Sequence, residues 1–258
     1  MSGQSVHVEK TGGMTVITMN RPEVMNALNS EMRKALIAAL NEAAGTARAI
    51  VLTGTGRAFC SGQDLADGGA VTEIDFEATL RDEYEPLVRA IYDAPVPVIA
   101  AVNGAAAGAG ANLALAADVV IASESASFVQ AFSRIGLIPD AGGTYWLPRQ
   151  IGFPRAMGAA LFAGKIGARQ AVEWGMIWEC VADEAFEATW RAQAMQIAEG
   201  PTLAFRHLKR ALRESHANNL DAQLALEARL QAECGASRDF VEGVTAFLQK
   251  RPARFEGR

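Results

Sequence analysis

Short runs of aliphatic and β-branched residues recur along the first half of the chain and predict buried β-strands. Four such runs end at turn residues, at positions 14–20, 48–53, 97–102 and 118–122. Between the first two runs, Asn29 or Ser30 is suited to cap a helix. Apolar residues at helical spacing then predict one buried helix face, formed by Met32, Leu36, Ile37 and Leu40. Strands that alternate with helices indicate an α/β fold of repeated ββα or βαβ units.

The pattern changes after about residue 150, where apolar residues follow a helical period. Helices are predicted at 154–164, 168–175, 184–198, 201–215 and 220–233, and no convincing strand follows residue 182. We therefore expect an α/β core at 1–195 and a helical C-terminal segment at 196–258 that mediates oligomerisation. The acidic, polar stretch at 66–83 has weak periodicity and predicts a mobile loop that leads into a helix.

Composition narrows the range of partners. The 258 residues are 50% hydrophobic and 21% charged, as in a globular protein with a sizeable core, and the net charge is -5. This acidic balance argues against nucleic acid as the main partner, although a local basic cluster could still bind a polyanionic ligand. The start of the chain lacks the pattern of a secretory signal, and no apolar stretch reaches the ~18 residues of a membrane span. Cys60, Cys180 and Cys234 show no disulfide or metal spacing, so we expect a cytoplasmic protein.

The first motif that could carry chemistry is 60–65 (CSGQDL), which follows the predicted strand at 48–53. A turn of small residues after a strand can leave backbone N–H groups unpaired and directed at a ligand. Asp64 would then cap a following helix. Cys60 has no His near it in the sequence and is expected to be a small packing residue rather than a nucleophile. An ordinary strand-to-helix connection explains the same residues.

The second motif is 103–112 (NGAAAGAGAN), in which Gly and Ala let the backbone approach a ligand closely. If a helix begins near Ala109, its free N–H groups would stabilise an anion there. The glycine spacing does not fit a nucleotide-binding fingerprint. Tight packing of a helix is the alternative.

The third motif is 136–144 (GLIPDAGGT), in which Asp140 has mainly apolar neighbours. Burial would raise the pKa of its carboxyl, which suits a group that takes up and returns a proton. The alternative is that Asp140 caps a helix by accepting a hydrogen bond from the amide of Gly142 or Gly143.

Together, these motifs resemble the crotonase (enoyl-CoA hydratase/isomerase) family along essentially the whole chain. The shared landmarks, in order and spacing, are 20–22 (NRP), 26–28 (NAL), 56–65 (GRAFCSGQDL), 101–104 (AVNG), 116–118 (AAD), 136–139 (GLIP) and 142–144 (GGT). The resemblance implies a spiral of ββα units with a helical C-terminal part, assembled as trimers or pairs of trimers. It also implies an acyl-CoA thioester substrate, with no metal or redox cofactor, since coenzyme A enters as part of the substrate.

By position, the resemblance assigns the backbone N–H groups of Gln63 and Ala109 to hold the thioester carbonyl. Such donors stabilise the charge that builds on the oxygen when a proton next to the thioester is withdrawn. The other residues expected to contact the substrate are Asn26, Ala27, Leu28, Ser61, Gly62, Asp64, Leu65, Asn112, Phe132, Phe247 and Lys250. The last two are expected near the coenzyme A site of an adjacent subunit.

Two departures from the hydratase pattern point to an isomerase. Hydratases of this family position a water molecule with two glutamates, and this chain has Asn112 and Phe132 at those places. Asp140 stands where typical hydratases have Gly. A carboxylate here is similar to that of the ring-epoxide isomerases of aerobic phenylacetate breakdown. The segments at 128–133, 174–178 and 242–248 also resemble those isomerases. The 4-chlorobenzoyl-CoA dehalogenases have an Asp here too, but use it as a nucleophile.

The expected function is an acyl-CoA isomerase with Asp140 as its single base. It would isomerise 1,2-epoxyphenylacetyl-CoA to oxepin-CoA or shift the double bond of an enoyl-CoA. The alternatives are an enoyl-CoA hydratase or Δ3,Δ2-enoyl-CoA isomerase of fatty-acid oxidation, and a non-catalytic relative that binds acyl-CoA or RNA. An RNA-binding relative would need a basic surface, which the net charge of -5 disfavours.

Overall fold

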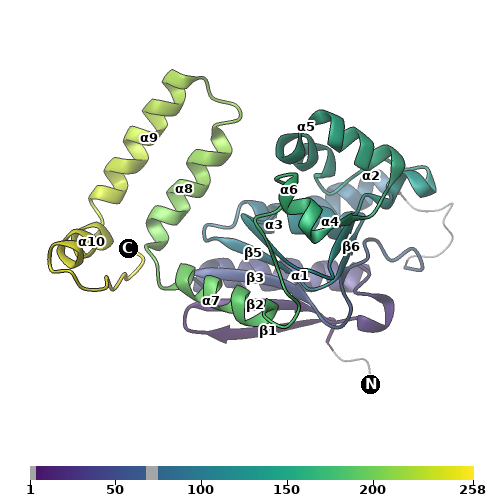
Figure 1. Ribbon diagram of the computed structural model, residues 1–258, viewed down its shortest axis with the longest axis horizontal. Helices are drawn as coiled ribbons and strands as arrows, with labels where there is room; N and C mark the ends of the chain where they lie inside the picture. The colour runs from purple at the N-terminus through teal and green to yellow at the C-terminus, as the bar shows by residue number, and fades with distance from the viewer. Residues whose placement is uncertain (1–3, 68–74) are drawn as a thin grey trace.

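The computed structural model describes residues 4–67 and 75–258, so part of the loop predicted at 66–83 lies outside the described residues. Two sheets and their packed helices form the core (Figure 1). The strands are β1 (Val6–Thr11), β2 (Met14–Met19), β3 (Ala49–Gly54), β4 (Ala58–Cys60), β5 (Val98–Val102), β6 (Ala105–Ala107), β7 (Val119–Ser123), β8 (Ser127–Val129), β9 (Ile166–Gly167) and β10 (Glu179–Val181). The α-helices are α1 (Ser30–Thr46), α2 (Phe76–Thr79), α3 (Glu85–Tyr92), α4 (Ala109–Leu115), α5 (Gly143–Phe162), α6 (Ala168–Glu173), α7 (Phe186–Ala198), α8 (Thr202–Glu214), α9 (Leu220–Gly235) and α10 (Arg238–Leu248). Short 3-10 turns are η1 (Pro22–Val24) and η4 (Ala131–Ile135), and a π-helical turn is η3 (Leu80–Tyr84).

Successive strands divide themselves between the two sheets. The larger sheet has the order β1-β2-β3-β5-β7-β10, and the smaller sheet has the order β4-β6-β8-β9. β3, β5 and β7 run parallel in the larger sheet, whereas β4, β6 and β8, which follow them along the chain, run parallel in the smaller one. One or more helices then lead back to the larger sheet. The core is therefore a spiral of ββα units, as the resemblance implied.

The central strands of the larger sheet bury both faces. One face, with Ile50 and Leu52, belongs to the same apolar cluster as the buried residues of α1 and α3. The opposite face, with Val51, packs with Phe186 and Trp190 of α7. Because both faces are buried, these strands are apolar at consecutive positions. The four strands predicted from such runs are all present, as β2, β3, β5 and β7.

The helices confirm the prediction in part. Asn29 is the N-cap of α1, and its side chain accepts a hydrogen bond from the Met32 amide at 2.9 Å. α5 begins at Gly143 rather than near residue 154, and Gly152, with a φ of 76°, kinks it. α10 was not predicted. No helix in the described part of the chain is both long and apolar enough to cross a membrane.

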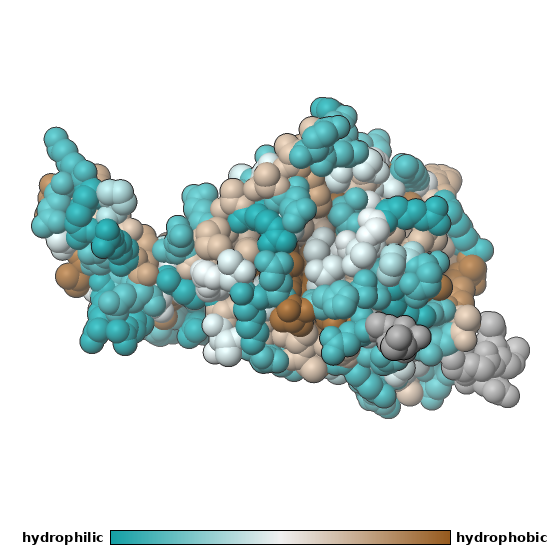
Figure 2. Space-filling model, turned by 90° about the horizontal axis from the view of Figure 1, so that it is seen from below, coloured by the Kyte–Doolittle hydropathy of each residue, from teal (hydrophilic) through white to brown (hydrophobic). Residues whose placement is uncertain are grey.

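The last three helices, α8, α9 and α10, form a C-terminal arm that projects from the main body (Figure 1; Figure 2). The boundary predicted at residue 195 falls inside α7, which packs on the larger sheet, so the arm begins after α7. Asp118 fastens α8 to the core through ion pairs with Lys209 (2.8 Å) and Arg213 (2.7 Å). Large apolar side chains remain exposed along the arm: Leu208, Leu212, Leu220, Leu224, Phe240, Val241, Phe247 and Leu248.

Candidate active site

Three segments meet at the candidate site because the strands before them end at one edge of the smaller sheet. β4, β6 and β8 are parallel neighbours, so their carboxyl ends lie together, where ligands of parallel sheets commonly bind. The segments that follow these strands are 61–65, called the donor loop, then 108–109, and then 130–140. The sheet thus brings together three motifs that are separate in the sequence.

In the described part of the chain, the backbone N–H groups of Gln63 and Ala109 have no acceptor, so they can donate to a ligand. The residues on either side of Gln63 pair with Leu28, whereas the Gln63 amide donates no hydrogen bond among the described residues. Ala109 is the first residue of α4, so its N–H has no partner inside the helix. Gly62 lets the two segments approach: a Cβ on it would lie 2.9 Å from the Ala107 oxygen and 3.4 Å from the Ala109 nitrogen.

Asp140 lies in the loop before α5, and its carboxyl is largely buried. Burial raises the pKa of this carboxyl to about 6, and a hydrogen bond from its own backbone amide offsets the rise only in part. No described residue donates a hydrogen bond to its buried Oδ1. The helix-cap alternative is wrong, because Gly142 is the N-cap and the Gly143 amide bonds the backbone oxygen of Asp140 at 2.8 Å. The direction of this shift agrees with the one expected from the sequence.

A cavity of about 240 Å³ joins these groups. The predicted site residues that line it are Ser61, Gly62, Gln63, Leu65, Ala109, Phe132 and Asp140. Phe132 is buried, and its ring lies 3.8 Å from the position of a Cβ on Gly108, so it closes the cavity beside the Ala109 amide. Among the described lining residues, Asp140 carries the only carboxylate. A second cavity, of about 870 Å³, shares Asp140, Tyr84 and Leu137 with the first.

Asn112 does not line the cavity, in contrast to its prediction as a substrate contact. It is fully buried, and both polar atoms of its side chain are hydrogen-bonded to other residues of the protein. Its Nδ2 donates to the backbone oxygen of Asp140, and its Oδ1 accepts from Nε2 of Gln130, both at 2.8 Å. A buried amide paired in this way is held firmly in one orientation. Asn112 therefore positions the loop that carries Asp140.

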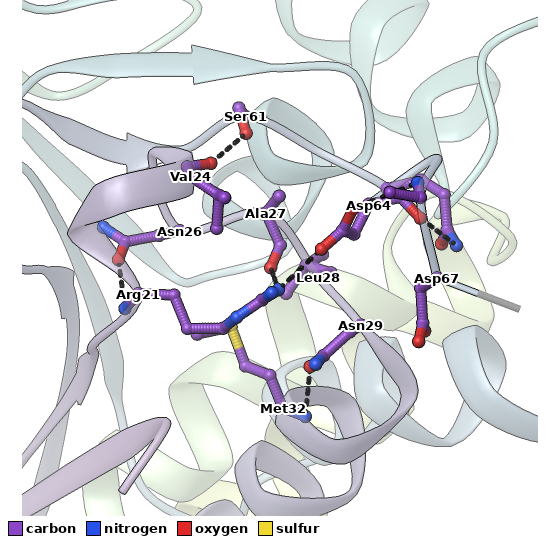
Figure 3. A network of polar contacts seen from close by, with 12 residues as sticks. Arg21, Val24, Asn26, Ala27, Leu28, Asn29, Met32, Ser61, Asp64 and Asp67 are labelled. Carbon is purple, nitrogen blue, oxygen red and sulfur yellow. Dashed lines mark hydrogen bonds and ion pairs between the residues drawn. The ribbon is translucent and has the colours of Figure 1, made fainter. Parts of the chain in front are cut away.

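Four predicted contacts also lie outside the cavity lining: Asn26, Ala27 and Leu28, which support the donor loop, and Asp64, which belongs to it (Figure 3). The buried side chain of Asn26 accepts from the backbone N–H of Arg21 and donates to three backbone oxygens of β4 and the turn before it. Arg21 in turn donates from Nη1 to the Ala27 oxygen at 2.6 Å and to the Asp64 carboxylate at 2.9 Å. Asp64 also accepts from the amide two residues on, so it caps a turn rather than the helix expected after it.

Two residues that sequence reasoning missed hold the side chain of Gln63. Arg33 donates from Nη1 to the Gln63 Oε1 at 2.8 Å, and the Tyr84 hydroxyl donates to the same oxygen at 2.5 Å. The Arg33 side chain is only 3% exposed although it is charged. These contacts join segments 30 and 21 residues apart, so no local pattern pointed to them.

The remaining predicted residues lie elsewhere. Phe247 and Lys250 are exposed at the end of the C-terminal arm and do not line the cavity, so their place beside an adjacent subunit stays a prediction. Cys60 is fully buried, and burial raises the pKa of its thiol to about 12, as suits a packing residue. Within residues 4–67 and 75–258, no group of three or more His, Cys, Asp or Glu residues could hold a metal ion.

Comparisons with known proteins agree with this arrangement. A family model described as enoyl-CoA hydratase/isomerase matches residues 9–258. The chain is 64% identical to a protein of Rhodobacter capsulatus named probable enoyl-CoA hydratase, over the full length of both. It is 48% identical to the 1,2-epoxyphenylacetyl-CoA isomerase of Escherichia coli, over 98% of this chain and 97% of that protein. It is also similar to the crystal structure of an enoyl-CoA hydratase from Bacillus anthracis, with a TM-score of 0.92 and 31% identity over 99% of this chain and 100% of that one. The chain therefore belongs to the enoyl-CoA hydratase/isomerase family, the crotonases, whose enzymes act on acyl-CoA thioesters.

Proposed function

We propose that this protein is an acyl-CoA isomerase that uses Asp140 as its single base. The observation that carries the proposal is the cavity beside the free amides of Gln63 and Ala109, in which Asp140 is the one carboxylate among the described lining residues. A pKa of about 6 leaves this carboxylate mostly ionised at neutral pH, yet basic enough to take a proton.

In the proposed reaction, Asp140 removes a proton from the carbon next to the thioester carbonyl. The resulting enolate oxygen accepts hydrogen bonds from the Gln63 and Ala109 amides, which stabilise its charge. The electrons then open a ring epoxide toward an oxepin, or shift a double bond, and Asp140 returns the proton where the product needs it. This route needs no metal or redox cofactor, because the thioester itself makes the proton acidic.

The proposed substrate is 1,2-epoxyphenylacetyl-CoA, and the proposed metabolic pathway is phenylacetate catabolism. Support comes from the 48% identical relative named for that isomerase activity. Aromatic and aliphatic side chains around Asp140, including Phe76, Tyr84, Phe132 and Leu137, suit a ring rather than a polar acyl group.

Hydration of an enoyl-CoA is the alternative, because the 64% identical relative is named a probable hydratase. A hydratase of this family needs two carboxylates to hold one water molecule. Asn112 and Phe132 occupy those places in this chain, and the Asn112 amide is already committed to Gln130 and Asp140. A shift of the double bond in a fatty enoyl-CoA remains compatible with the same single base.

The proposed assembly is a trimer or a pair of trimers. The exposed apolar side chains of the C-terminal arm support burial against neighbouring subunits, since isolated soluble chains rarely leave such a surface uncovered. In this assembly, Phe247 and Lys250 would approach the coenzyme A site of an adjacent subunit. Light scattering should report three or six chains of 27.3 kDa.

A panel of three thioesters tests the proposed activity. The protein is expected to convert 1,2-epoxyphenylacetyl-CoA, or failing that a 3-enoyl-CoA, and to hydrate crotonyl-CoA only slowly. Rapid hydration of crotonyl-CoA without isomerisation of either other thioester would show that the protein is a hydratase.

A further inference from the structure

The most unusual charged group near the site is the buried guanidinium of Arg33. It donates from Nη1 to the backbone oxygen of Leu28 at 2.7 Å and to the side-chain oxygen of Gln63 at 2.8 Å. Leu28 is the residue that pairs with both neighbours of Gln63. The Arg33 side chain, which belongs to α1, therefore binds both the donor loop and the neighbouring segment that contains Leu28.

Tyr84, which lines the cavity, is the second residue that binds the Gln63 side chain. Its hydroxyl donates to the same Gln63 oxygen, and the Arg33 guanidinium lies 5.0 Å from the centre of its ring. Burial, above all other influences, raises the pKa of this hydroxyl, so the group stays a proton donor at any physiological pH. The Gln63 oxygen thus receives two hydrogen bonds, one of them from a cation, which are the stronger kind.

Two carboxylates balance the buried charge. Glu83 lies 2.7 Å from the Arg33 guanidinium and Asp67 lies 3.9 Å from it. Burial alone would raise the pKa of Glu83, but the hydrogen bond and charge of Arg33 outweigh it and lower the pKa overall. Glu83 and Tyr84 both belong to the π-helical turn η3. Such turns are rare in proteins overall, and those that occur are often found at functional sites.

These contacts serve a mechanical need of the proposed reaction. The Gln63 amide must point at one oxygen, yet Gln63 follows a glycine with a φ of 95° in a loop rather than a regular strand. One backbone contact holds that peptide, because the Leu28 amide donates to the Gly62 oxygen at 2.8 Å, and the Gln63 side chain is a second point at which it can be fixed. Arg33 and Tyr84 donate to the Gln63 side-chain oxygen, and Arg33 also donates to the Leu28 backbone oxygen, which accepts from the Asp64 amide. These contacts restrain the chain on either side of the Gln63 amide.

We propose that Arg33 is a positioning residue, which acts with Tyr84 through the Gln63 side chain to aim the Gln63 amide at the thioester oxygen. This inference rests on the proposed function of the site. Loss of a single oxyanion donor costs about 10²–10³ in kcat in other enzymes, and a donor that is misaligned rather than absent should cost ~10–100-fold.

Four variants test the proposal: Arg33→Lys, Arg33→Met, Tyr84→Phe and Gln63→Met. The first keeps the charge but not the planar set of donors, and the last two remove one hydrogen-bonding partner each with little change in size. Arg191→Met is the matched control, because Arg191 lies on α7, where it is paired with Glu187 and with Glu9 of β1, and it does not line the cavity. Turnover of the best thioester of the panel should show kcat lowered ~10–100-fold with KM changed less than ~3-fold, and the control unchanged.

A spectroscopic measurement separates positioning from a general loss of structure. Cinnamoyl-CoA has a chromophore conjugated to its thioester carbonyl, so donors that polarise the carbonyl shift its absorption to longer wavelength. The unaltered protein and Arg191→Met should give this red shift on binding, whereas the four variants should bind cinnamoyl-CoA with a smaller shift. Thermal melting identifies any variant that is unfolded.

The outcomes are distinct. If the unaltered protein turns over no thioester and gives no red shift, the proposed function fails. If it gives both, and folded Arg33→Lys, Tyr84→Phe and Gln63→Met keep the full kcat and red shift, the inference about Arg33 is overturned. Should the Arg33 variants fail to fold, Tyr84→Phe and Gln63→Met decide the question, since both act on the same oxygen.

Discussion

Asp140→Asn should make the stability of the protein less dependent on pH and should lower its activity. The pKa of the Asp140 carboxyl is about 6 in the folded protein, against an ordinary value of 3.8. Because the folded state raises this pKa, it binds the proton more tightly than the unfolded state between these two values, and the protein loses stability as the pH rises. With about 1.4 kcal/mol for each pKa unit, the ionised carboxylate costs the folded state ~3 kcal/mol above pH 6.

The pH dependence of this cost can be worked out separately from any constant effect of the substitution. From the two pKa values, the cost is ~3 kcal/mol at pH 8 and roughly half of that at pH 5. The free energy of unfolding of Asp140→Asn minus that of the unaltered protein should therefore fall by roughly 1–2 kcal/mol from pH 8 to pH 5. A buried amide without partners adds its own penalty, but that penalty is the same at every pH.

Urea unfolding of both proteins at pH 5, 6, 7 and 8 measures this difference. Asp183→Asn is a control of opposite sign, because hydrogen bonds from Ser123 and the Ser125 amide lower the pKa of Asp183. Isomerase turnover should fall by ~10²-fold or more in Asp140→Asn, and kcat of the unaltered protein should decline as the pH drops below about 6. A stability difference that is flat with pH, together with near-normal turnover, would refute both the buried carboxylate and its role as the base.

Three further changes have expected outcomes. Asn26→Ala removes the side chain that binds one backbone N–H and three backbone oxygens beside the donor loop, of which the Ala58 oxygen keeps another donor, Asn103; the free energy of unfolding in urea should fall by ~2–4 kcal/mol, and a loss below ~0.5 kcal/mol would contradict this network. Gly62→Ala should lower kcat at least ~10-fold in a steady-state assay, because the glycine has a φ of 95° and its Cβ would press on the Ala107 oxygen; unchanged kcat would mean that the loop adapts. Phe247→Asp combined with Leu248→Asp should shift the mass in light scattering toward one chain, whereas an unchanged oligomer would place the subunit contact elsewhere.

The four strands predicted from apolar runs all belong to the larger sheet, and none of them belongs to the smaller sheet that builds the site. β3 and β5 show an apolar run in the sequence because both faces of their sheet are buried and because these strands are long enough for the run to be recognised. β6 consists of three alanines and carries no periodic signal at all. Yet β6 is the strand that brings Ala109 beside the donor loop. The motifs could therefore be recognised one by one, but only the family resemblance joined them.

The environment of Asp140 could be anticipated, but its support could not. Apolar neighbours in the sequence indicated a buried carboxyl with a raised pKa, because residues that are adjacent in the sequence also surround the carboxyl in the folded loop. Asn112 lies 28 residues away, and an Asn in an alanine-rich helix has the same sequence pattern whether it contacts substrate or protein. Arg33 is harder still, since a charged residue next to the buried face of a helix normally lies at its solvent-exposed edge.

The spacing of strands in the smaller sheet suits the width of the proposed oxyanion site. Its two donor amides follow β4 and β6, which are adjacent strands, and adjacent strands lie about 4.8 Å apart. Two N–H groups that each reach one oxygen at about 2.9 Å, roughly 110° apart around it, are separated by about the same 4.8 Å. The repeat distance of a β-sheet therefore matches the span needed to grip a single carbonyl oxygen. A clamp with these dimensions can persist while the side chains around the acyl group change, so new substrates can be accepted without rebuilding it.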